Sequence, residues 1–193
     1  MARLDDFNAE PPDRAAEALR TCNAAPRFAA ELVAGRPYPD ADTLVARAEE
    51  VARGLAWGEV SIALAAHPRI GDRPEGSSAE AEASRREQSS MSDADAATRD
   101  ALVEGNRAYE ERFGHVFLIR AAGRSPEEML AELRRRLAND AAAEQVEATE
   151  QLAQITGLRV RGLVSSATAT GERASQGAPA TEERNESGAE PVT

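Results

Sequence analysis

The chain has few of the residues that build disulfides, metal centres and aromatic cores. Its 193 residues include one cysteine and two histidines, and aromatic residues make up 4% of the sequence. The single cysteine, Cys22, excludes an internal disulfide and a cysteine-rich metal site. The histidines, His67 and His115, form no His-x-x-x-His or Glu-x-x-His pair, so we expect no metal. Glycine-rich nucleotide-binding motifs are also lacking, which leaves no support for a nucleotide cofactor. The Gly-x-Ser-x-Gly nucleophile motif is lacking too, so serine-hydrolase chemistry has no support.

Basic residues are in deficit and long apolar runs are lacking. Lys and Arg total 23 against 34 Asp and Glu, which gives a formal net charge of −11. Phosphate binding requires a basic surface, so we expect no nucleic-acid partner, although one or two local arginines could still bind an anionic small molecule. No stretch approaches the length of a membrane span, and residues 1–6 lack the basic and apolar parts of a signal peptide. We therefore expect a cytoplasmic protein with no membrane partner.

The residue types that are abundant, and their spacing, favour helices. Ala, Glu, Arg and Leu dominate and runs of β-branched residues are absent, a composition typical of an all-helical protein. Apolar residues recur at helical spacing in several stretches, and Ser125-Pro126-Glu127-Glu128 is a strong helix start. We predict an all-α fold, a compact single-domain bundle of about seven to eight helices. The predicted domain covers residues 1–165, and its composition predicts a disordered polar, acidic tail over residues 166–193.

Local patterns give approximate bounds for these helices. Asp42 is the expected N-cap of one helix, and the apolar residues Val146 and Leu158 are expected to follow the period of the last helix. Gly157, inside that last helix, should cost about 1 kcal/mol relative to alanine. Val116–Ile119 is the only strongly extended-looking segment. The expected helices cover 15–20, a stretch from Pro26, 42–55, 59–66, 78–90, a stretch from Ser92–Asp95 to Gly114, 125–139 and a stretch from Asp140.

Residues 59–66 form an apolar run that ends at His67 because Pro68 follows. Proline disfavours the α region for the residue before it, so His67 should lie at a fixed helix end. Such a position is suited to presenting a proton-transfer group. On spacing alone, a histidine in this position more often only terminates a helix, since a helix C-terminus favours histidine electrostatically.

A polar helix face is predicted further along the chain. Ser84, Glu87 and Gln88 stand at i, i+3 and i+4, so they share one face of the expected helix over 78–90. This face is either solvated or lines a polar pocket. Arg159 lies in an apolar frame between Leu158 and Val160, where it could simply extend its charged end to solvent.

Together these segments resemble one family, the decarboxylases of 2-oxo-4-hydroxy-4-carboxy-5-ureidoimidazoline (OHCU). The resemblance spans residues 7–165, and its most specific part is His67-Pro68-Arg69-Ile70-Gly71-Asp72 followed by Ser84-x-x-Glu87-Gln88. Asn106-x-x-Tyr109-x-x-Arg112-Phe113-Gly114 and Leu158-Arg159-Val160 extend it. The resemblance implies an all-α, cofactor-free and usually dimeric enzyme. It further implies that the substrate is OHCU and that the products are (S)-allantoin and CO2, at the end of the conversion of urate to allantoin.

The resemblance also implies roles for individual residues. His67 matches the general acid/base, Glu87 matches the carboxylate that works with it, and Arg159 matches an arginine that holds an anionic or carbonyl group. These three are the expected catalytic residues. The expected substrate-binding residues, with backbone contacts in the segment 119–123, are Pro68, Ser84, Arg85, Arg86, Glu87, Gln88, Ile119, Arg120, Ala121, Ala122, Gly123 and Arg159.

Three residues depart from the family pattern. Arg120 stands where the family commonly has a small or neutral residue, Phe28 replaces what is often tryptophan, and Gly157 should loosen the helix just before Arg159. Two other functions stay open. One is a catalytically silent binding or accessory protein of the same fold, and the other is a decarboxylase of a related ureido or imidazoline acid, which Arg120 keeps open.

Overall fold

The structure, a computed structural model, describes residues 4–70 and 95–165. These residues form eight helices and no strand, which confirms the predicted all-helical fold. The predicted helix over 78–90 and the predicted tail over 166–193 lie outside the described residues. The helices are α1 (Leu4–Ala9), α2 (Pro12–Arg20), α3 (Pro26–Ala34), α4 (Ala41–Arg53), α5 (Trp57–Ala65), α7 (Ala96–Phe113), α8 (Pro126–Arg136) and α9 (Ala141–Ser165).

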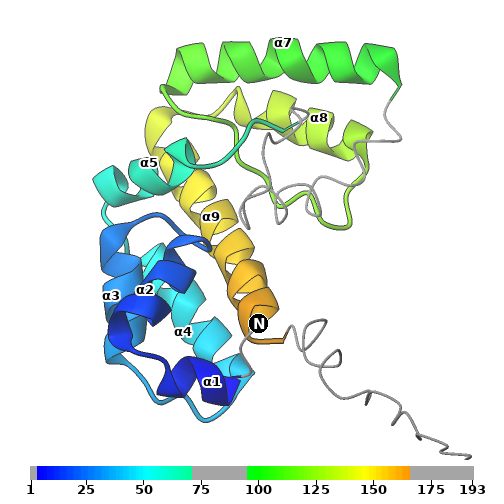
Figure 1. The fold of residues 1–193 in the computed structure, drawn as a ribbon. Helices are drawn as coiled ribbons and strands as arrows, with labels where there is room; N and C mark the ends of the chain where they lie inside the picture. Colours follow the sequence, from blue (N-terminus) through cyan, green and yellow to red (C-terminus); the bar gives the residue numbers. More distant parts are fainter. Residues whose placement is uncertain (1–3, 71–94, 166–193) are drawn as a thin grey trace, which may run out of the picture.

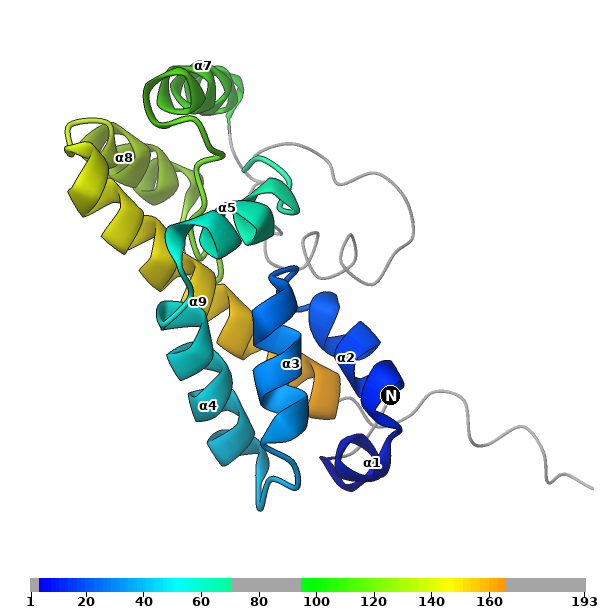
Figure 2. The ribbon, with the colours of Figure 1, turned by 90° about the vertical axis from the view of Figure 1, so that its left-hand side faces the viewer.

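The long helix α9 is the element along which the others are arranged (Figure 1). Its 25 residues give it a length of about 37 Å at 1.5 Å per residue. α4 packs along α9, and α5 and α1 also contact it. The pair α7 and α8 lies beside the end where α9 begins, away from α1–α4, as the turned view also shows (Figure 2).

Two hydrophobic clusters form the core. The first joins α1–α5 to α9, and the second joins α7 and α8. Residues 116–121 contribute to both: Leu118 packs in the first cluster, whereas Phe117, Ile119 and Ala121 pack in the second. Side chains that alternate in this way are those of an extended chain. The extended-looking segment of the sequence therefore lies between the two clusters, with no strand partner among the described residues.

Helix ends follow the expected signals with one exception. Asp95 caps α7, Ser125 and Glu128 form a capping box on α8, and Gly114 ends α7 at a φ of 75°. The prediction that Asp42 caps α4 is wrong. Asp40 is the cap, because it has the extended backbone that an N-cap needs, and its carboxylate accepts a hydrogen bond from the Thr43 N–H at 2.7 Å.

The face of α9 differs from the sequence prediction at two positions. Val146 is 71% exposed and Leu158 is 39% exposed, so neither belongs to the core face. Gly157 is buried against α4, where a Cβ atom would lie 2.5 Å from Glu49 Oε1. Glycine at this position therefore lets the flexible Glu49 side chain of α4 lie close against α9. The N-terminal helix α1, which buries Phe7, was not predicted.

A buried polar cluster ties α7, α8 and α9 together. Arg136 of α8 and Glu144 of α9 are both fully buried, and Arg136 Nε donates to Glu144 Oε1 at 2.9 Å. Tyr109 of α7 donates its hydroxyl to the same carboxylate, and burial is the main cause that raises its pKa. Arg136 Nη1 also donates to the Leu118 carbonyl at 2.8 Å. One arginine thus joins three helices to the segment 116–121.

Candidate active site

His67 lies directly after α5, as the sequence predicts. Its side chain is 7% exposed, its backbone N–H donates to the Leu64 carbonyl at 3.0 Å, and its ring Nδ1 lies 2.8 Å from the Ala63 carbonyl oxygen. A carbonyl oxygen only accepts hydrogen bonds, so the contact assigns the proton of the neutral ring to Nδ1. Nε2 is then left with a lone pair.

The surroundings of His67 favour this neutral form. Burial is the largest cause and the positive charge of Arg159 is the second, and together they lower the pKa of His67 to about 4, although the hydrogen bond to Ala63 acts in the opposite direction. Nε2 is buried and has no hydrogen-bond partner among the described residues. At neutral pH the ring is therefore uncharged, and its buried Nε2 keeps a free lone pair.

Arg159 reaches this region from α9. It is half-buried, and its charge is close enough to act on His67. The structure thus brings two of the three predicted catalytic residues, from α5 and α9, into one region. Glu87, the third, lies outside the described residues, and so do the predicted substrate-binding residues Ser84, Arg85, Arg86 and Gln88.

The chain that follows His67 is bound to α7. After the half-buried Pro68, Arg69 forms a bidentate ion pair with Glu110, with Nε to Oε1 at 2.5 Å and Nη2 to Oε2 at 2.8 Å. Asn106 Nδ2 donates to the Ile70 carbonyl at 2.9 Å. Sequence reasoning did not assign Asn106 or Glu110 to the site. The signal for Asn106 was a polar residue inside the buried stripe of its helix.

The predicted backbone-contact segment 119–123 has an alternating exposure. Ile119 and Ala121 are buried, whereas Arg120, Ala122 and Gly123 are exposed. The Arg120 N–H donates to Gln151 Oε1 of α9 at 2.8 Å, so this backbone donor is already used within the protein. Gln151, which sequence reasoning did not select, thereby holds the segment in place. The substrate contacts themselves stay a prediction.

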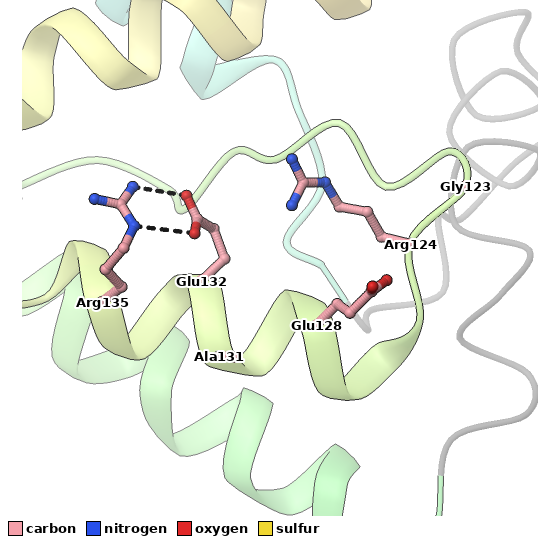
Figure 3. Close-up of a pocket in the computed structure, with 6 residues that line it drawn as sticks. All are labelled: Gly123, Arg124, Glu128, Ala131, Glu132 and Arg135. Carbon is pink, nitrogen blue, oxygen red and sulfur yellow. Dashed lines mark hydrogen bonds and ion pairs between the residues drawn. The ribbon is translucent and has the colours of Figure 1, made fainter.

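A surface hollow of about 520 Å³ lies beside the end of this segment (Figure 3). Of the residues predicted to bind substrate, it contains Gly123 but not His67 or Arg159. Arg135, on its rim, is ion-paired with Glu132 and with Glu147. The charge of Arg135 is therefore balanced by neighbouring glutamates. Because neither His67 nor Arg159 lines the hollow, it is separate from the region of His67.

Within residues 4–70 and 95–165, no three His, Cys, Asp or Glu side chains gather so as to hold a metal ion. Among these residues there is also no helix with the length and apolar character needed to cross a membrane.

The described residues define an all-helical protein in which a buried imidazole follows α5 and an arginine of α9 acts on it electrostatically. Residues 8–161 match the OHCU decarboxylase family, and the chain belongs to that family. The chain is similar to the 2-oxo-4-hydroxy-4-carboxy-5-ureidoimidazoline decarboxylase of Amia calva. It is 33% identical to that protein over 144 residues, which cover 72% of this chain and 81% of the fish protein.

A plant protein and two solved structures are also similar. The uric acid degradation bifunctional protein TTL of Arabidopsis thaliana is 31% identical over 156 residues, which cover 76% of this chain but only 46% of that protein. A crystal structure of OHCU decarboxylase in the presence of (S)-allantoin matches with a TM-score of 0.65 at 27% identity, over 76% of this chain and 96% of that one. An (S)-allantoin synthase structure matches with a TM-score of 0.65 at 17% identity, over 88% of this chain and 56% of that one, and shows the shared fold alone.

Proposed function

We propose that this chain catalyses the decarboxylation of OHCU to (S)-allantoin and CO2. The observation that carries the proposal is the state of His67 in a member of the OHCU decarboxylase family: its buried Nε2 is an unprotonated acceptor, and the charge of Arg159 acts on the ring. The names of the similar proteins, which refer to OHCU decarboxylase, uric acid degradation and (S)-allantoin, support the same substrate and product.

The substrate needs little from the protein beyond orientation and proton transfer. Its carboxylate and hydroxyl are both on C4, next to the C5=N bond. When the C4–carboxylate bond breaks, CO2 leaves, the electron pair forms a C4=C5 bond, and the C5=N electrons move to nitrogen, which takes up a proton. The resulting enol then loses the hydroxyl proton to become a C4 carbonyl, while C5 gains a proton. The net change is the loss of CO2 with one proton added at C5.

His67 fits the proton-transfer part of this sequence. In the free protein it is neutral, so it starts as a base that can take the proton of the C4 hydroxyl on Nε2. It can then return that proton to one face of C5, which would give a single enantiomer. Arg159 would hold the carboxylate or the polar edge of the ring. Glu87 would act with His67, and Pro68, Ser84, Gln88 and the segment 119–123 would contact the substrate.

Two further properties belong to the same proposal. We expect a homodimer and a cytoplasmic location, as the family resemblance and the sequence features suggest. Gel filtration with light scattering tests the first, and fractionation of cells that express the full chain tests the second.

The decisive experiment follows the optical activity of allantoin. Urate is oxidised by the preceding enzymes of the pathway, and circular dichroism is recorded with and without the protein. We expect a fast signal of the S enantiomer with the wild type and with His115→Gln, which removes the other histidine. His67→Ala should lose that signal yet keep its helical far-ultraviolet spectrum. A slow, racemic product with the wild type would reject the proposal.

A further inference from the structure

The four residues from His67 to Ile70, here called the His67–Ile70 turn, are held at both ends by different helices. At the start, the His67 N–H binds the Leu64 carbonyl and its ring binds the Ala63 carbonyl, both in α5. At the end, Ile70 is buried in the second hydrophobic cluster, which contains residues of α7. The turn is therefore a bridge between α5 and α7, with the imidazole at one end of it.

α7 contacts this bridge through two polar side chains. Asn106 Nδ2 donates to the Ile70 carbonyl at 2.9 Å, and Glu110 receives the bidentate pair from Arg69. Asn106 and Glu110 are four residues apart, so they lie on one face of the helix. The two contacts thus fix two successive residues of the turn against the same side of α7.

These contacts orient the His67–Ile70 turn more than they stabilise the folded protein. Asn106 is 3% exposed, and its Oδ1 is buried with no hydrogen-bond partner among the described residues. A buried acceptor without a partner is destabilising, which offsets part of the stability that the hydrogen bond to the Ile70 carbonyl contributes. The side chains of Arg69 and Glu110 are 52% and 25% exposed, so their pair adds little to folding. A bidentate pair does, however, fix the orientation of both groups.

We infer that Asn106 and Glu110 are positioning residues that fix the His67–Ile70 turn and thereby the place of His67 Nε2 against the substrate. Proton transfer requires the two atoms within hydrogen-bond reach. A displacement of about 1 Å can cost about a hundredfold in rate even when the altered residue does not touch the substrate. The kinetic part of this inference rests on the proposed function, whereas the state of the imidazole can be measured without substrate.

The first measurement separates kcat from KM for Asn106→Ala, Glu110→Gln and the control Glu111→Gln. Glu111 is exposed and adjacent to Glu110, so its variant should keep the wild-type kcat. We expect kcat to fall by about tenfold to a hundredfold in Asn106→Ala and by less in Glu110→Gln, with KM nearly unchanged. A role in folding alone would reduce the fraction of folded protein but leave kcat per folded molecule unchanged.

The second measurement observes the imidazole directly. The chain has only two histidines, so ¹⁵N-histidine labelling gives few signals, and His67→Gln identifies those of His67. At pH 7 the wild type should show a protonated Nδ1 and a bare Nε2. In Asn106→Ala and Glu110→Gln we expect this single tautomer to become a mixture.

The two measurements decide the inference together. Unchanged kcat per folded molecule, or an unchanged His67 tautomer, in both variants would overturn it. If Asn106→Ala does not fold, Glu110→Gln decides the matter, because its ion pair lies at the surface. If the wild type makes no (S)-allantoin, the proposed function fails, and the tautomer measurement alone decides whether these residues position His67.

Discussion

The imidazole Nδ1 of His67 lies 2.8 Å from the carbonyl oxygen of Ala63, one helical turn earlier in the chain. The same carbonyl also accepts the Ala66 N–H at 3.2 Å, so it is shared by the backbone of the helix end and by the imidazole. The contact with the imidazole also decides which ring nitrogen has the free lone pair, since Nδ1 must carry the proton. Pro68 adds a restriction on the backbone of His67 itself. The helix end and the chemistry of the site are therefore one structural feature.

The pH dependence of the reaction should show an unusually acidic histidine. Burial and Arg159 lower the pKa of His67 to about 4, and in the proposed mechanism the neutral ring is the active form. We expect kcat/KM to stay level from pH 8 down to about pH 5 and then to fall about tenfold per pH unit below 4. Rates measured on protein shown to be folded at each pH provide the test. A midpoint near pH 6.5 would contradict the buried, neutral state.

The same histidine should make folding stability depend on pH. Between pH 6.5 and 4 the unfolded chain binds a proton at this histidine that the folded chain does not, so the free energy of unfolding falls as the pH is lowered through this range. The stabilisation is complete above pH 6.5, and the loss at pH 4 should reach about 3 kcal/mol for this group. Urea unfolding of wild type and His67→Gln at both pH values measures it. Equal losses in the two proteins would refute this assignment.

Much of the fold follows from local sequence signals. The capping box at Ser125 and the left-handed Gly114 were predictable because each depends on a few neighbouring residues. The contact at Gly157 could not be predicted, for the opposite reason. It involves Glu49 of α4, more than 100 residues earlier, and no local pattern contains that contact. α1 was missed because it is only six residues long, with too few positions to show a period.

The candidate site likewise has features that local sequence signals predict and features that they cannot predict. His67 could be selected because proline follows it, but spacing alone left it open whether it was more than a helix terminator. The pairing of Asn106 with Ile70 and of Gln151 with Arg120 joins residues more than 30 positions apart, which spacing cannot reveal. The low pKa of His67 also required the structure, since it results from burial and from a charge on α9.

Breaking the buried pair of Arg136 and Glu144 should strongly destabilise the protein. Arg136→Met leaves a buried carboxylate and the Leu118 carbonyl without their partner, and removing one member of such a pair costs about 3–5 kcal/mol. Arg135→Met is the matched control. Arg135 is half-exposed, and its ion pairs should contribute less than about 1 kcal/mol. Urea unfolding compares the two variants. Equal losses in the free energy of unfolding would mean that the buried pair stabilises the protein no more than the surface pairs of Arg135 do.

Gln151 offers a test of whether the segment 119–123 contacts the substrate. Its side chain accepts the Arg120 N–H at 2.8 Å, so Gln151→Leu should free this part of the segment while leaving the core of α9 intact. Because the predicted substrate contacts come from this backbone, we expect KM to rise severalfold with a smaller change in kcat. The free energy of unfolding should fall by about 1 kcal/mol, the usual worth of one hydrogen bond.

Two matched variants complete this test. Gln154→Leu removes a neighbouring glutamine of α9 that binds Glu150 at the surface, so KM should not change. Arg120→Ala removes an exposed side chain and keeps the N–H that Gln151 holds, so it should also leave KM near the wild-type value. A rise in KM with Arg120→Ala but not with Gln151→Leu would mean that the arginine side chain contacts the substrate. That result would favour a related ureido or imidazoline acid with an additional anionic group, because only then would an extra cation at the site be used.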